Sequence, residues 1–86
     1  MVAKAVLTSA NDLNQLTTGV YTWNTSRPQN LPEGQDNGLI IVFEGNISGV
    51  FYNFQLCSLP GRVLYYRRKK GNSEAGFAEW ARVAIV

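Results

Sequence analysis

The cationic side chains of Arg67, Arg68, Lys69 and Lys70 form the densest chemical grouping in the chain, and they directly follow two tyrosines. Clustered cations beside aromatic rings are typical of surfaces that bind nucleic acids or anionic glycans. In a β-strand, however, Arg67 and Lys69 would point to one face, and Arg68 and Lys70 to the other. We therefore expect a solvated strand end beside a turn, and we keep a small nucleic-acid-binding domain only as a further alternative.

Aromatic residues offer a second kind of recognition chemistry, because their rings stack on sugars and on nucleic-acid bases. The chain has four tyrosines and two tryptophans, which are Tyr21, Trp23, Tyr52, Tyr65, Tyr66 and Trp80. In a domain of this size most of them are expected to form the core. We expect Trp23, just before a long polar loop, to be the most exposed of them, and Tyr66 to be the next.

Catalytic and metal-binding groups are sparse. The chain has no histidine and one cysteine, Cys57, which excludes an internal disulfide and the usual metal ligand sets. Cys57 falls within a predicted strand, where a thiol behaves as a small apolar side chain. The acidic residues are scattered; Glu33 and Asp36 share a glycine-containing loop, but they lack the repeated acidic pattern of a calcium site. We predict no enzymatic activity, no metal and no cofactor.

The composition indicates one small domain that associates with other chains. The chain has 86 residues, of which 45% are hydrophobic and 16% are charged, whereas an average globular domain is about 25% charged. Burial in an interface between copies would explain this shortage of charge, so we expect an oligomer. The net charge of +2 does not by itself indicate a polyanionic partner, and no apolar segment is long enough to cross a membrane.

The stretch Val50–Lys70 predicts the hairpin that organises the fold. Its first half alternates with a period of two, and we place the more apolar set, Val50, Tyr52, Phe54 and Leu56, on the core face. Leu59–Arg62 contains Pro60 and Gly61 and predicts the turn. This turn places Ser58 opposite Val63, Leu56 opposite Tyr65 and Phe54 opposite Arg67.

The remaining patterns complete a mainly β fold, a small antiparallel meander or sandwich with one short N-terminal helical turn. Leu39–Phe43 is uninterruptedly apolar and predicts a central strand covered on both faces. Phe77–Val86 predicts the last strand, with a bulge near Glu79 because Phe77, Trp80 and Val83 are spaced by threes. The other expected elements are a short strand or linker at Met1–Leu7, a helical turn at Asp12–Leu16, a strand at Val20–Trp23, a loop at Asn24–Asn37 and a reversal at Gly71–Gly76.

The order of these segments resembles the knob domain of phage tail fibres and R-type pyocin fibres. The resemblance spans Asn11 to Val83 and consists of DLNQLTTGVY, a proline-containing polar loop, Asn37-Gly38 before an apolar strand, a basic strand and FAEWARV. It implies an antiparallel β knob from residue 11 to 86, preceded by a linker or shaft segment from residue 1 to 10. It further implies a place in the virion tail, assembly in the bacterial cytoplasm and a homotrimeric fibre that contacts the host surface.

We therefore predict a knob module that recognises host glycan or lipopolysaccharide by multivalent adhesion. The candidate contact residues lie in the long loop and on the basic strand, and they are Trp23, Arg27, Asn30, Tyr66, Arg68 and Lys69. The main alternative is a structural module that trimerises the fibre, or docks neighbouring tail proteins, without touching a receptor.

Overall fold

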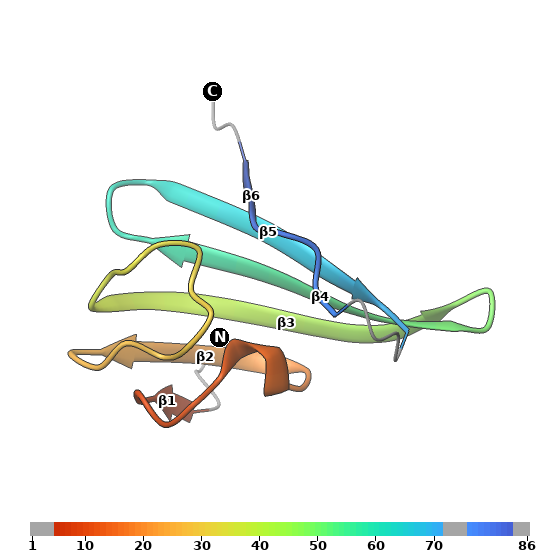
Figure 1. Cartoon of the computed structure of the whole chain (residues 1–86), viewed down its shortest axis with the longest axis horizontal. Coiled ribbons are helices and arrows are strands. Elements are labelled where there is room, and N and C mark those ends of the chain that lie inside the picture. The colour runs from red at the N-terminus through yellow and green to blue at the C-terminus, as the bar shows by residue number, and fades with distance from the viewer. Residues whose placement is uncertain (1–4, 72–75, 84–86) are drawn as a thin grey trace.

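The chain folds into one six-stranded sheet whose strands follow each other in sequence order, β1-β2-β3-β4-β5-β6 (Figure 1). The computed structural model describes residues 5–71 and 76–83. The strands are β1 (Ala5–Leu7), β2 (Gly19–Asn24), β3 (Asn37–Ile47), β4 (Val50–Leu59), β5 (Val63–Lys70) and β6 (Ala81–Val83), and the 3-10 turn η1 is Leu13–Gln15.

Strands β2 to β6 form an antiparallel meander, and β1 pairs with β2 in parallel. The prediction of a mainly β meander with one short helical turn is confirmed, and the described residues form a single sheet and not a sandwich. Asp12 caps η1 as expected, because its carboxylate accepts a hydrogen bond of 2.8 Å from the Asn14 backbone N–H.

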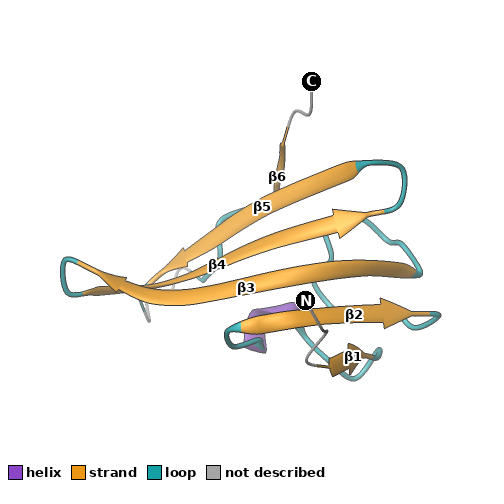
Figure 2. Cartoon of the chain, turned by 180° about the vertical axis from the view of Figure 1, so that it is seen from behind, coloured by secondary structure: helices purple, strands orange, loops and turns teal. Residues whose placement is uncertain are grey.

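The two faces of the sheet have different surroundings. Loop residues 8–18 with η1, the loop 25–36 and the segment 77–80 lie over one face, which we call the covered face. From behind, in Figure 2, these loops lie on the far side of the strands, and no described loop crosses the nearer side. We call that nearer side the open face.

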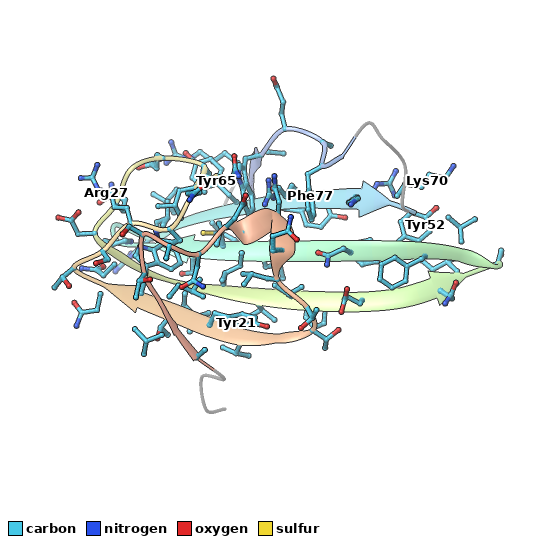
Figure 3. All side chains as sticks on the ribbon, turned by 60° about the horizontal axis from the view of Figure 1, so that its bottom comes forward. Tyr21, Arg27, Tyr52, Tyr65, Lys70 and Phe77 are labelled. Carbon is cyan, nitrogen blue, oxygen red and sulfur yellow. The ribbon has the colours of Figure 1, made fainter. Side chains whose placement is uncertain are left out.

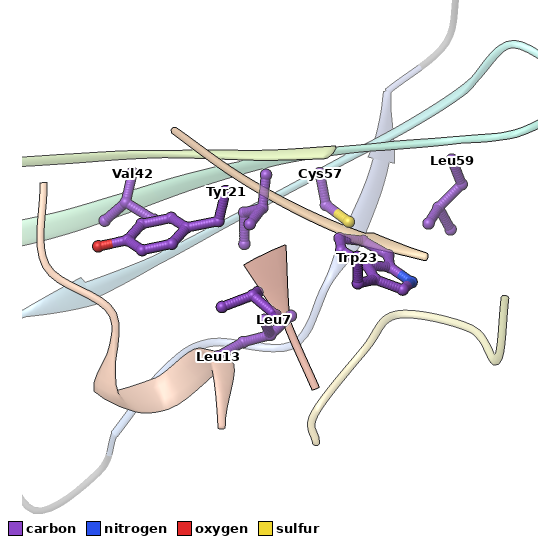
Figure 4. Close-up of a cluster of buried hydrophobic side chains, with 8 residues drawn as sticks. Leu7, Leu13, Tyr21, Trp23, Val42, Cys57 and Leu59 are labelled. Atoms are coloured by element: carbon purple, nitrogen blue, oxygen red, sulfur yellow. The ribbon is translucent and has the colours of Figure 1, made fainter. Parts of the chain in front are cut away.

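The core lies between the covered face and its loops (Figure 4). Its buried hydrophobic residues are Leu7, Leu13, Tyr21, Trp23, Ile40, Val42, Cys57 and Leu59. Two amides share this layer, because the irregular cover leaves backbone carbonyls that need donors. The Gln55 side chain donates to the Leu13 carbonyl at 2.7 Å, and the Asn53 side chain donates to the Leu16 carbonyl at 3.1 Å.

The predicted core face of β4 is wrong. Asn53, Gln55 and Cys57 are buried under the cover, whereas Phe54 and Leu56 lie on the open face and are only partly buried. The expectation that the apolar strand Leu39–Phe43 is covered on both faces is also wrong for a single chain, since Phe43 on the open face is 49% exposed.

The predicted register of the hairpin is wrong by one residue. Ser58 pairs with Leu64, Leu56 with Tyr66 and Phe54 with Arg68. The reason is a three-residue connection between Leu59 and Val63, in which both Gly61 and Arg62 adopt positive φ (88° and 62°). A left-handed arginine is uncommon, and the sequence gives no signal for it.

The C-terminal strand begins at Ala81 and not at Phe77 as predicted, and the bulge at Glu79 is wrong because residues 78–80 are not in a strand. Phe77 forms an isolated bridge with Lys69, and the chain then crosses the covered face before β6. Most of the expected reversal, residues 72–75, lies outside the described residues, as do residues 1–4 and 84–86. In the N-terminal segment, β1 belongs to the sheet, and Leu7 is buried against it.

Candidate functional site

The six candidate contact residues do not form one surface. Strand alternation and register place Tyr66 and Arg68 on the open face, together with Phe54. Trp23, Arg27, Asn30 and Lys69 belong to the covered face or its loops. Figure 3 shows Arg27 at one end of the sheet and Tyr52 and Lys70 at the other.

Trp23 is a core residue, so the expectation that it is the most exposed aromatic residue is wrong. Its side chain is 1% exposed, and its indole N–H donates to the Gln35 carbonyl at 2.9 Å. The ring lies against Gly38, the partner of Trp23 across the β2–β3 pair. Trp23 therefore anchors the long loop to the sheet and cannot contact a ligand.

The exposed candidates in the loop take part in local polar contacts. The Arg27 guanidinium forms an ion pair of 2.8 Å with Asp36, and both side chains are exposed. The Asn30 side chain donates to the Asp12 carboxylate at 2.6 Å, and the Asn30 carbonyl accepts a bond of 2.9 Å from the Trp80 indole. These contacts hold the side chains of Arg27 and Asn30 in place on the surface of the loop.

The open face carries a row of aromatic rings on β4 and β5. The rings of Tyr52 and Phe54 stack at 5.5 Å, and those of Phe54 and Tyr66 at 6.5 Å. The Arg68 guanidinium lies 5.7 Å from the Tyr52 ring centre. The row gives this face an apolar, π-rich centre with a cation beside it.

Arg67 occupies a site that sequence analysis missed. It is 6% exposed, and its Nε donates to the side-chain oxygen Oε1 of Gln55 at 2.8 Å. Its guanidinium lies 4.0 Å from the Phe77 ring centre and 4.4 Å from that of Trp80. Burial lowers the pKa of Arg67 to about 10. In the sequence, the one feature that indicated this site was the three-residue spacing of Phe77 and Trp80.

The basic run is divided between the two faces, as the alternation predicted. Arg67 is buried and Lys69 partly buried on the covered side, whereas Arg68 and Lys70 are exposed on the open side. A nucleic-acid backbone needs several cations along one surface. The division leaves no such stripe on β5.

Among the described residues, the fold shifts the pKa of Cys57, Glu33 and Tyr65, in addition to that of Arg67. Cys57 is fully buried, and burial raises the pKa of its thiol to about 12, so it behaves as the predicted apolar side chain. The Tyr65 hydroxyl donates to Glu33 at 2.5 Å, and this bond lowers the pKa of the Glu33 carboxyl. Within residues 5–71 and 76–83, no three acidic or cysteine side chains are grouped to hold a metal ion. No helix among them is long and apolar enough to span a membrane.

No family model, curated protein or solved structure matches this chain.

Proposed function

We propose that this protein is a knob module of a bacteriophage tail fibre or tailspike, and that it contributes to attachment at the host surface. It acts without catalysis, as part of a virion tail assembled in the bacterial cytoplasm. Its partners are further copies of itself, in a homotrimer, and neighbouring tail proteins. The ligand class is surface glycan or lipopolysaccharide.

This proposal rests on one observation: the segments that resemble the fibre knob form the cover and the strands of the described fold. DLNQL forms the capped turn η1, the proline-containing loop becomes the cover, Asn37-Gly38 opens β3, and FAEWARV supplies both the segment over Arg67 and β6. An antiparallel β knob is the architecture that the resemblance implies.

The proposed contact surface is the outer side of the cover. Arg27 and Asn30 are exposed there, whereas Lys69 lies on the same side of the sheet but at its other end, next to Lys70. A guanidinium and an amide are suited to phosphate, uronate and sugar hydroxyls. Each contact is weak and open to solvent, so affinity comes from repetition over several copies held in one fibre.

The test is binding of the purified chain to lipopolysaccharide from a panel of bacteria, measured by biolayer interferometry. We expect Arg27→Ala combined with Lys69→Ala to weaken binding to the responsive lipopolysaccharide about tenfold, a loss of about 1.4 kcal/mol. Arg68→Ala is the matched control, because it removes a cation from the open face and should leave binding unchanged. Absence of binding across the panel, or equal loss with Arg68→Ala, would contradict the proposal.

A structural role is the second candidate, and the open face favours it. A module that holds a fibre together needs an apolar surface that its own chain does not cover, and β3, β4 and β5 present one. In that case the protein trimerises the fibre or docks neighbouring tail proteins, and it has no receptor contact.

A further inference from the structure

We infer that the open face of the sheet is a self-association surface, and that the group covering it is another copy of this chain. This inference rests on the part of the proposed function that has copies of the chain as partners, and it is independent of host attachment. It follows from the composition of the face, its area, its edges and the positions of its charges.

The centre of the open face is apolar across the sheet. One row of paired residues runs through Val20, Ile41, Leu56, Tyr66 and Ala81. The next row contains Phe43 and Phe54 and ends at Arg68, and the flanking rows add Leu39, Leu64, Tyr52, Ile47 and Val83. A surface rich in aromatic and aliphatic side chains and poor in charge has the composition of an interface core.

The flat area of the face is smaller than the area that one partner of a typical interface buries, and it is at the upper end of the apolar patches of monomers. The strands β2 to β5 are about 4.8 Å apart, and the eight residues of β5 span about 26 Å at about 3.3 Å per residue. The flat footprint is therefore about 500 Å², before the relief of the side chains is added. A typical interface buries about 800 Å² on each partner, and the largest apolar patch on a monomer is about 300–600 Å².

The edge strands of the sheet are too short to pair well with another chain, so copies are expected to associate through the open face. In the described part of the chain, the edge strands β1 and β6 have three residues each. Such short edges give few backbone groups for pairing with another strand. Sheets that meet through their faces pack about 10 Å apart with their strands nearly aligned. The sheet of a second copy has the same twist, which suits it to this aligned packing.

The charges on the face favour a second copy over a charged partner. Among the described residues of β2 to β5 on this face, the charged ones are Arg68 and Lys70, both exposed at the C-terminal end of β5. Both cations lie at one end of β5, and the rows of paired residues through Ile41 and through Leu39 carry no charge, so that part of the face can pack against another copy without burying a charge. An acidic partner would find no cation in the centre to pair with.

The first test is the mass of the purified chain by size-exclusion chromatography with light scattering over a wide concentration range. We expect a mass two or three times the 9.5 kDa of one chain. Phe43→Glu should raise the dissociation constant about thirtyfold or more, as expected for an interface hot spot. Asn46→Glu is the matched control on the opposite side of β3, where the side chain is exposed, and it should associate like the parent chain.

The second test keeps the inference falsifiable if Phe43→Glu does not fold. Ser58 is exposed on the open face, and the native Cys57 beside it is buried. We expect Ser58→Cys to react with a maleimide slowly in concentrated solution and rapidly on dilution, whereas Asn46→Cys reacts rapidly in both. A 9.5 kDa particle at all concentrations, or equal labelling of the two variants, would overturn the inference. An associated chain that binds no lipopolysaccharide would refute the attachment proposal alone.

Discussion

Gly38→Ala is predicted to destabilise the protein strongly, although the substitution adds one methyl group. A Cβ built on Gly38 would lie 2.5 Å and 2.6 Å from two atoms of the Trp23 ring and 3.0 Å from the Ser58 carbonyl oxygen. The ring cannot move aside easily, because it is 1% exposed and its N–H is bonded to the Gln35 carbonyl. Forcing extra volume into a packed core costs about 1–3 kcal/mol, and a broken hydrogen bond adds about 1 kcal/mol.

We therefore expect a loss of about 2–4 kcal/mol in the free energy of unfolding, measured by urea denaturation at one fixed protein concentration. For a domain of this length, that loss lowers Tm by about 10 °C or more. Gly45→Ala is the matched control on the same strand, since its Cβ would meet no atom within 4 Å. It should change stability by less than about 0.5 kcal/mol.

A double-mutant cycle identifies the clash as the cause. Trp23→Phe removes the part of the ring that meets the new methyl group, so Gly38→Ala should cost less in that background, with a coupling of about 1 kcal/mol or more. The reasoning is refuted if Gly38→Ala and Gly45→Ala have the same effect, or if the two substitutions at positions 23 and 38 are additive.

Two further predictions concern the buried side chains of β4. Gln55→Leu should lower the free energy of unfolding by about 2–4 kcal/mol in urea denaturation, because it leaves the Leu13 carbonyl and the Arg67 Nε buried without partners; equal or greater stability would contradict this. Cys57 should not react with a thiol reagent at pH 8 until the chain is unfolded. Because its folded pKa of about 12 exceeds an ordinary thiol's of about 8.5, its contribution to stability is complete below pH 8.5 and is lost as the pH rises towards 12 in an alkaline titration followed by circular dichroism.

Local patterns predicted the strands well, because alternation and turn residues act over a few neighbours. The meander, the capped turn at Asp12 and the split of the basic run all follow from such short-range rules. The buried face of β4 could not be predicted in this way. Gln55 and Asn53 are buried because carbonyls of residues 13 and 16, about forty positions earlier, accept their hydrogen bonds.

The candidate site was predicted less well, because exposure depends on which loop folds over which residue. Trp23 was expected at the surface since it precedes a polar loop, but that loop turns back and closes over the ring. Arg67 was expected at a solvated strand end, but Phe77 and Trp80 enclose it. The apolar set on β4 was wrongly assigned to the core of the single chain, and it lies on the open face, where we propose that a second copy packs.

The hydrogen bond from Trp80 to Asn30 also constrains the order of events during synthesis. It joins residues fifty positions apart, and Asn30 contacts Asp12 through its side chain. The cover is therefore completed only after residue 80 has been made, although the bond from Trp23 to Gln35 can hold the long loop before that. Contacts between residues so far apart in the sequence slow folding, so Arg67 stays uncovered until the segment 77–80 has been made and has docked.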